Sequence, residues 1–171
     1  PIIVRSSSFL EDGFGNAFAG KYESVFCANR GMSEERLTMF ENAVRQVYAS
    51  TMDISALEYR RQRGLEGKDE QMAVLVQRVS GSYYGNLYMP CAAGVGYSYS
   101  TYKLQKDIRP DEGMLRLVMG LGTKAVDRTE NDYPRLVNLD RPTITMARNT
   151  AEKHRFSQHK IDVLDLEKNT L

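Results

Sequence analysis

The sequence lacks several features that would place it in a broad class at once. Among its 171 residues only Cys27 and Cys91 are cysteines, and they fit no metal or redox spacing. We expect both to be buried, reduced thiols of a cytosolic protein. No apolar run approaches the about 18 residues that a membrane span needs, and no basic-then-apolar signal segment is found.

An excess of charge of either sign is also missing. The chain has 23 basic and 22 acidic residues, which gives a net charge of +1. Because binding to nucleic acid or to an acidic membrane usually needs a basic surface, we expect neither as a partner. A composition of 42% hydrophobic and 26% charged residues is ordinary for a globular domain, and the length fits one domain.

Common catalytic and metal-binding motifs are missing as well. His154 and His159 are five residues apart, so they do not share one helix face, and we expect them at the surface. No Ser-His-Asp or Cys-His motif is visible, although such residues can meet from distant positions. Neither a Walker loop nor a dinucleotide fingerprint is present, so the function has to be sought in less general patterns.

The order of the apolar segments predicts an α+β fold. We expect strands over residues 2–8, 21–28, 71–79 and 113–122, a hairpin or two short strands within 81–102, and a short strand after Pro134. Ser33 and Asp53 are predicted to cap two helices, and Gly64 to end the second. Runs of strands, instead of strict strand–helix alternation, favour a mainly antiparallel sheet with two helices packed on it.

Further details of this pattern are expectations about burial and local structure. The first helix should bury a stripe formed by Leu37, Phe40, Val44, Val47 and Tyr48. The strand 71–79 is nearly continuously apolar, which predicts burial on both faces. Residues 123–133 are predicted to form a polar loop, and residues 149–171 to be helical or irregular and then extended.

A pattern that suits an anion follows the first strand. Arg5 precedes Ser6, Ser7 and Ser8, and residues 11–20 contain three glycines. Arginine pairs phosphate oxygens in a bidentate manner, and glycines let main-chain amides come close to a phosphate. The pattern alone leaves open the alternative of a solvated arginine beside a polar turn.

Two further segments could complete a ligand site. In GLGTKAVDR (120–128), glycines end a strand and Lys124 and Arg128 follow, which suits an anion but is also typical of a tight turn with exposed basic residues. In VLVQRV (74–79), the strand ends in Gln77 and Arg78 and could offer its backbone edge to a purine. Taken alone, it is equally a core strand.

Together these segments resemble the nucleotide-binding domain of the phosphoenolpyruvate synthase and pyruvate phosphate dikinase family. The resemblance lies in VRSSSFLEDGFGNAFAGKYES (4–24), AVRQVYASTMDISALEYRRQRG (43–64), MAVLVQRV (72–79) and GLG (120–122), in the family's order and at about its spacing. It implies an ATP-grasp-like lobe. We therefore expect a partial nucleotide-binding domain over residues 1–139 and a C-terminal extension of unknown role over 140–171.

The resemblance implies ATP and Mg²⁺ as cofactors and assigns site residues to them. The nucleotide-binding residues that it implies are Arg5, Ser6, Ser7, Glu11, Asp12, Gly20, Gln77, Arg78, Val79, Gly122 and Lys124. Arg5 matches the arginine that contacts the phosphates, and Arg128 could replace a family arginine whose segment is here LYMPCAAG (87–94), so both are assigned catalytic roles.

The sequence departs from the family pattern at the metal. The family's GLGE motif carries a metal-holding carboxylate, and its position is here Thr123. Mg²⁺ needs oxygen ligands, so substitutes are sought in AVDRTENDYP, which contains Asp127, Glu130 and Asp132. Of these, Asp127 and Asp132 are the predicted metal ligands.

The activity that the resemblance implies is that of a cytoplasmic, ATP-dependent phosphotransferase of the pyruvate, water dikinase type. ATP would phosphorylate a histidine on a swivelling domain, and the phosphate would pass to pyruvate to give phosphoenolpyruvate. The chain lacks a TSGGxTSHAA-like histidine motif and a pyruvate-binding barrel, begins without Met and ends in an alternating pattern. We expect a fragment that is inactive alone and reaches pyruvate through other domains of its parent chain.

Two other functions stay open at this stage. The first alternative is a non-catalytic nucleotide-binding or regulatory module that kept the scaffold, because the GLGE carboxylate and the arginine segment are replaced. The second, weaker alternative is another ATP-grasp-type ligase, which would need an acceptor site. Homo-oligomerisation is left open.

Overall fold

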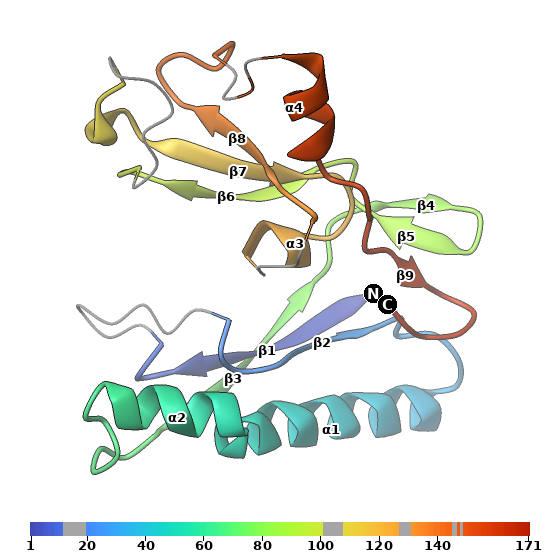
Figure 1. The fold of residues 1–171 in the computed structure, drawn as a ribbon. Helices are drawn as coiled ribbons and strands as arrows, with labels where there is room; N and C mark the ends of the chain where they lie inside the picture. The colour runs from blue at the N-terminus through green and yellow to red at the C-terminus, as the bar shows by residue number, and fades with distance from the viewer. Residues whose placement is uncertain (12–19, 101–107, 127–130, 145–146, 148) are drawn as a thin grey trace. The chain divides into compact units, whose positions relative to one another are not determined.

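The computed structural model describes residues 1–11, 20–100, 108–126, 131–144, 147 and 149–171. These residues form two compact units: unit 1 comprises Pro1–Ser80 and Leu164–Leu171, and unit 2 comprises Gly81–Val163. Both units combine helices with antiparallel strands (Figure 1), which confirms the predicted α+β class. The boundary at residue 139 concerns the extent of the nucleotide-binding region and stays a prediction.

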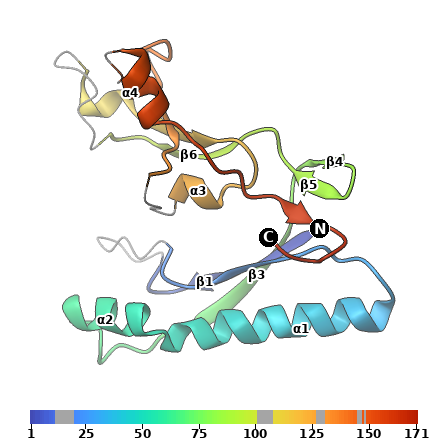
Figure 2. The same cartoon turned by 45° about the vertical axis from the view of Figure 1, so that its right-hand side comes forward.

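Unit 1 is a three-stranded antiparallel sheet with helices on one face. Its strands have the order β2-β1-β3. The elements are β1 (Ile2–Ser8), β2 (Ser24–Cys27), α1 (Ser33–Ala49), the 3₁₀ helix η1 (Ser50–Met52), α2 (Ile54–Gln62), β3 (Met72–Arg78) and β9 (Leu164–Asp165). Figures 1 and 2 both show α1 and α2 along the same face of this sheet, which we call the helix face.

The core of unit 1 lies between α1 and the sheet. Val4, Cys27, Ala43 and Val47 are buried there together, and Phe40 and Val44 pack against them. Leu37 and Tyr48 are 56% and 48% exposed, so the predicted stripe of α1 is wrong at both of its ends. The side chains of α1 that pack in this core lie between Phe40 and Val47, and Leu37 and Tyr48 fall outside that stretch.

The helix ends follow the sequence with one correction. Met32, not Ser33, is the N-cap of α1, and its backbone amide donates to Oε2 of Glu35 at 2.9 Å. The glutamate therefore satisfies the amide without a serine hydroxyl at the cap. Asp53 is the N-cap of α2, and Gly64 follows that helix with a φ of +66°, as the sequence predicts.

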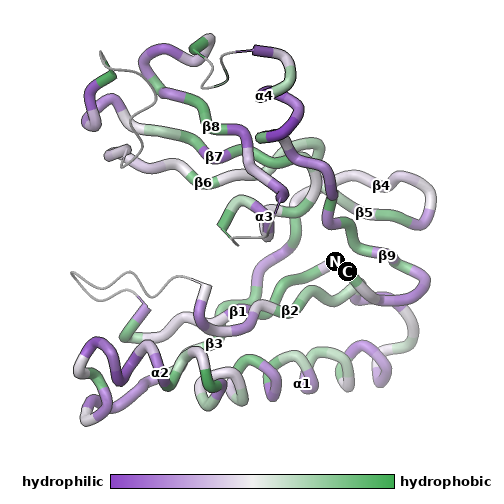
Figure 3. The backbone as a smooth tube through the Cα atoms, viewed as in Figure 1, coloured by the Kyte–Doolittle hydropathy of each residue, from purple (hydrophilic) through white to green (hydrophobic). Residues whose placement is uncertain are grey.

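The strands of unit 1 differ in burial from the sequence-based expectation. β1 changes from apolar to polar residues along its length (Figure 3), and Val4, Ser6 and Ser8 are buried whereas Arg5 is exposed. In β3, Leu75 and Val76 are 42% and 43% exposed, so the prediction that this strand is buried on both faces is wrong. β3 is an edge strand of the described sheet, and the helices cover only one of its faces.

Unit 2 contains a hairpin and a second antiparallel sheet. The elements are β4 (Ser82–Tyr84), β5 (Leu87–Met89), β6 (Ala93–Tyr97), the 3₁₀ helix η2 (Pro110–Glu112), β7 (Met114–Val118), α3 (Thr123–Val126), β8 (Arg135–Asn138) and α4 (Thr150–Arg155). β4 and β5 form the predicted hairpin, and the second sheet has the order β6-β7-β8. The short helix α3 replaces the beginning of the predicted polar loop.

A buried polar network connects two segments of unit 2. Glu112 accepts hydrogen bonds from the Arg109 amide at 3.1 Å, from Asn138 Nδ2 at 3.0 Å and from Arg141 at 2.9 Å. The Asn138 side chain in turn accepts the Arg141 amide at 2.7 Å. These bonds join η2 to the chain after β8 and satisfy polar groups that would be costly to bury alone.

The two cysteines differ in their exposure to solvent. Cys27 is buried, as predicted, but Cys91 is exposed, so that prediction is wrong for Cys91. His154 and His159 are both exposed, as expected. In the described ranges no helix has the length and the apolar character that a membrane crossing would require.

Candidate nucleotide site

The register of unit 1 decides which predicted residues share a face. Arg5 lies opposite Leu75 of β3, and Ile3 lies opposite Gln77. Directly paired residues point to the same side of a sheet and successive residues to opposite sides. Arg5, Ser7 and Gln77 therefore share the face away from α1 and α2, which we call the opposite face. Ser6 and Arg78 belong to the helix side, where Arg78 lies opposite Ile2.

Arg5 is presented on the opposite face as an available cation. The residue is exposed, although its neighbours Val4 and Ser6 are buried. Among the described residues, no hydrogen bond or ion pair to its guanidinium is found. A guanidinium on a rigid strand can pair with an anion without first breaking an internal contact.

Ser6, Ser8 and Glu11 contact one another at the end of β1. Ser6 Oγ donates to Glu11 Oε1 at 2.8 Å, and the Ser8 amide donates to Glu11 Oε2 at 3.2 Å. The Glu11 amide donates back to Ser8 Oγ at 3.1 Å. Two predicted site residues, Ser6 and Glu11, are thus joined to each other.

A second carboxylate contact holds the chain before β2. Tyr22 is buried, and its hydroxyl donates to Glu70 Oε2. Burial, together with this hydrogen bond and the Glu70 charge, raises the pKa of the Tyr22 hydroxyl. No local motif in the sequence marks this pair, because the two residues are 48 positions apart.

Several predicted residues cannot be placed in this geometry. Asp12, Asp127, Arg128 and Glu130 lie outside the described residues. Gly20 is described and has a φ of +76°, a left-handed conformation that favours glycine. Val79 donates its amide to the Pro1 carbonyl at 3.2 Å, which continues the pairing of β3 along β1.

In unit 2, the glycine turn after β7 is tied to the segment before β9. The Leu121 amide donates to the Asp162 carbonyl at 2.9 Å, and Thr123 Oγ1 donates to Asp162 Oδ2 at 2.5 Å. Gly122 lies between these contacts. Thr123, where the resemblance implies a metal-holding carboxylate, is thus engaged by a carboxylate from elsewhere in the chain. No motif in the sequence points to Asp162.

Lys124 and Asp132 lie close together and pair with each other, whereas the sequence assigns Lys124 to an anion and Asp132 to a metal ion. Lys124 Nζ lies 3.5 Å from Asp132 Oδ2 and 3.5 Å from Asp162 Oδ1. Asp132 Oδ1 accepts the His159 amide at 2.6 Å and the Lys160 amide at 3.3 Å. Burial alone would raise the pKa of Asp132, but these amides and the Lys124 charge lower it overall.

These contacts compete with the predicted roles of Lys124 as an anion-binding residue and of Asp132 as a metal ligand. The positive charge of Lys124 already faces two carboxylates, and both oxygens of Asp132 face donors or a cation. In the described part of the chain, no three metal-ligating side chains come together. The metal role of Asp127 and Asp132 stays a prediction.

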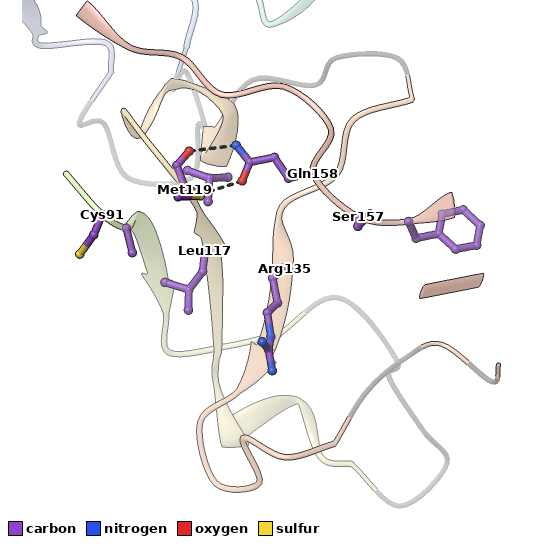
Figure 4. A pocket seen from close by; sticks show the side chains of 9 residues that line it. Cys91, Leu117, Met119, Arg135, Ser157 and Gln158 are labelled. Atoms are coloured by element: carbon purple, nitrogen blue, oxygen red, sulfur yellow. Dashed lines mark hydrogen bonds between the residues drawn. The ribbon is translucent and has the colours of Figure 1, made fainter. Parts of the chain in front are cut away.

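Unit 2 also has a pocket of about 360 Å³ with a mainly apolar lining. Leu117, Met119 and Phe156 line it, and Arg135 adds a charged group (Figure 4). Gln158 is fixed at its border, because its side chain accepts the Met119 amide at 2.7 Å and donates to the Met119 carbonyl at 2.9 Å. None of the predicted nucleotide-binding residues lines this pocket.

An exposed arginine on a strand and an adjoining edge strand are the parts by which an α+β domain can hold a phosphate and a purine. The chain matches, over residues 1–170, the family model described as pyruvate phosphate dikinase, AMP/ATP-binding domain, and it belongs to this family. The match confirms the resemblance and includes residues 140–170, which the resemblance left unassigned. It supports AMP or ATP as the ligand.

Proposed function

We propose that this chain is the ATP-binding portion of a phosphoenolpyruvate synthase-like phosphotransferase with an ATP-grasp-like fold. The parent protein would use ATP to phosphorylate a histidine on another domain and then convert pyruvate to phosphoenolpyruvate. The single observation that carries this proposal is the exposed guanidinium of Arg5 on the opposite face of unit 1. Membership of an AMP/ATP-binding family supports it.

In this proposal the phosphates and the adenine use neighbouring positions on one sheet. Arg5 pairs with phosphate oxygens, which neutralises charge that phosphoryl transfer has to stabilise. Gln77 shares the opposite face with Arg5, and β3 is an edge strand of the described sheet. A purine can therefore be bound through the backbone edge of β3 near Gln77 and Val79, with Leu75 as apolar contact.

Other parts of the assignment stay predictions. They are the catalytic role of Arg128, the metal role of Asp127, the use of ATP as its Mg²⁺ complex, the location in the cytoplasm and the binding of pyruvate by other domains. The expectation that neither nucleic acid nor a membrane is a partner, and the open question of a homo-oligomer, belong to the same group. Asp132 is the weakest part of the metal assignment, because Lys124 and two backbone amides face its oxygens.

The proposal is tested by calorimetric titration of ATP into the full chain that contains residues 1–171. Arg5→Ala should weaken binding by at least about tenfold, because hydrogen bonds to a charged group contribute roughly 1.5–3 kcal/mol. Arg45→Ala is the control, since Arg45 lies on the exposed side of α1 and pairs with Glu41. Equal affinity in wild type and Arg5→Ala would refute the site.

A second candidate function is a nucleotide-binding module without phosphoryl transfer. The observation that favours it is the engagement of Lys124 by Asp132 and Asp162, together with Thr123 bonded to Asp162. A phosphohistidine assay on the parent protein separates the two candidates. Label that moves from the γ-phosphate of ATP to histidine supports the enzyme, whereas ATP binding without such transfer supports the module.

A further inference from the structure

The end of β1 extends beyond its neighbour β2. Pairing between β1 and β2 ends at Arg5 and Ser24, whereas pairing between β1 and β3 continues to Ser8 and Met72. The Phe9 amide donates to the Gln71 carbonyl on the β3 side at 3.2 Å. Because successive amides of a strand point to alternate edges, the Ser8 amide points to the edge that β2 no longer covers.

Glu11 supplies the acceptor for the Ser8 amide that β2 does not supply there, and it also accepts a hydrogen bond from a serine side chain. Its Oε2 accepts the Ser8 amide at 3.2 Å, and its Oε1 accepts the Ser6 hydroxyl at 2.8 Å. Ser6 and Ser8 are only 7% and 2% exposed. Buried polar groups of this kind are costly when they lack a partner, so this carboxylate stabilises the strand end.

The position of these contacts separates Glu11 from the proposed ligand. Ser6 Oγ lies on the helix side of β1, and both carboxylate oxygens of Glu11 are bonded to Ser6 or Ser8. Arg5 projects from the opposite face. A carboxylate used in this way strengthens the strand that carries Arg5 and does not itself contact an anion held by Arg5.

We infer that Glu11 is a positioning residue, which closes the end of β1 through Ser6 and Ser8 and thereby fixes the strand from which Arg5 projects. This positioning role replaces the nucleotide-binding role that the resemblance implies for Glu11. The inference rests on the proposed function for its effect on ATP affinity, but the contacts themselves stand on the structure of unit 1.

The test compares Glu11→Gln with Glu11→Ala in the full chain. Glutamine keeps one acceptor for the Ser8 amide and offers an amide donor to the Ser6 hydroxyl, but it removes the charge. Glu11→Gln should therefore bind ATP within about threefold of wild type, with and without Mg²⁺, whereas Glu11→Ala should bind at least about tenfold more weakly. Glu23→Gln, a charge change at an exposed position near β2, is the matched control.

Opposite outcomes overturn the inference. If Glu11→Gln loses as much affinity as Glu11→Ala, and the loss appears only with Mg²⁺, the carboxylate acts on the metal or nucleotide. A double-mutant cycle of Ser6→Ala and Glu11→Ala adds a second readout. We expect the combined loss of affinity to be clearly smaller than the sum, because both changes remove the same hydrogen bond; additive losses would contradict the inference.

A measurement without nucleotide distinguishes failure of the proposed function from failure of the positioning role of Glu11. If wild type does not bind ATP, the function fails, while amide hydrogen exchange at Ser8 still tests the contact. Exchange should be slow in wild type and Glu11→Gln and at least about tenfold faster in Glu11→Ala. Equal exchange in all three proteins would overturn the positioning role, and Glu11→Gln alone decides where Glu11→Ala does not fold.

Discussion

Lys124 Nζ lies 3.5 Å from Asp132 Oδ2, and the two side chains are only 12% and 4% exposed. The sequence assigns these residues to different ligands, with Lys124 on an anion and Asp132 on a metal ion. In unit 2 they neutralise each other, and Asp162 adds a second carboxylate to the same ammonium. These ion pairs connect α3 to Asp132, which precedes β8, and to Asp162, which follows α4. We therefore expect a substitution of Lys124 or Asp132 to change the stability of unit 2.

Asp132→Asn should lower the free energy of unfolding by roughly 1–3 kcal/mol, because the His159 and Lys160 amides lose a charged acceptor and Lys124 keeps only Asp162 as its counterion. Chemical denaturation of wild type and variant measures this difference. Asp140→Asn is the control, since Asp140 is exposed. Unchanged stability, combined with a loss of Mg²⁺-dependent nucleotide binding, would instead support Asp132 as a metal ligand.

Stability should decline in acid partly through Glu112. The Arg109 amide, and then Arg141 and Asn138, lower the pKa of Glu112 below its ordinary value of 4.5. A lowered pKa in the folded state contributes stability above the unfolded pKa and loses it as the pH falls through the folded value. Glu112→Gln should therefore show a shallower decrease of the melting temperature below about pH 4.5 than wild type.

The control for this acid titration is Glu58→Gln, because Glu58 is exposed on α2. Its melting temperature should follow that of wild type between about pH 7 and pH 3. A Glu112→Gln profile parallel to wild type over that interval would show that the network around Glu112 does not contribute to acid sensitivity.

Gly120→Ala should destabilise unit 2. Gly120 has a φ of +85°, and a Cβ there would collide with Ile161 Cγ2 and lie 2.6 Å from the Asp162 carbonyl oxygen. We expect a loss of about 2 kcal/mol in the free energy of unfolding, since the backbone conformation and the space both oppose a side chain. Gly67→Ala is the control, because a Cβ added at Gly67 would have no other atom within 4 Å.

Tyr22→Phe should lower the free energy of unfolding by roughly 1–3 kcal/mol, because Glu70 loses a buried hydrogen-bond donor. The pKa of Tyr22 is raised, so this contribution is fully present below the unfolded pKa of 10.0 and is lost as the pH rises through the folded value. The difference between wild type and variant should therefore be constant from about pH 7 to pH 9. Tyr48→Phe, at an exposed position of α1, should match wild type.

Local patterns predicted a large part of the fold because they act over a few residues. The strand at residues 2–8, the cap at Asp53, the stop at Gly64 and the turn between β4 and β5 all appear in the structure. Burial was predicted less well. β3 reads as a core strand from its composition, but its exposure depends on which faces other elements cover.

The candidate site also has features that the sequence predicted and features that it did not. The segments 4–24, 43–64, 72–79 and 120–122, in their order along the chain, indicated the family, and the family match agrees. The partners of these residues were not predictable, because Glu70 with Tyr22 and Asp162 with Lys124 are far apart in the sequence. Distant pairs become neighbours only when the strands have taken their register.

By itself, the sequence determined the α+β class, the strand that carries Arg5 and the membership of an AMP/ATP-binding family, since these depend on local propensity and on ordered motifs. The tertiary structure alone decided which of Arg5 and Ser6 faces the helices, that Glu11 bonds to Ser6 and Ser8, and that Lys124 is paired with Asp132. The physical reason is that a charge or hydroxyl acquires its role from the groups that desolvate and pair it, and packing sets those groups.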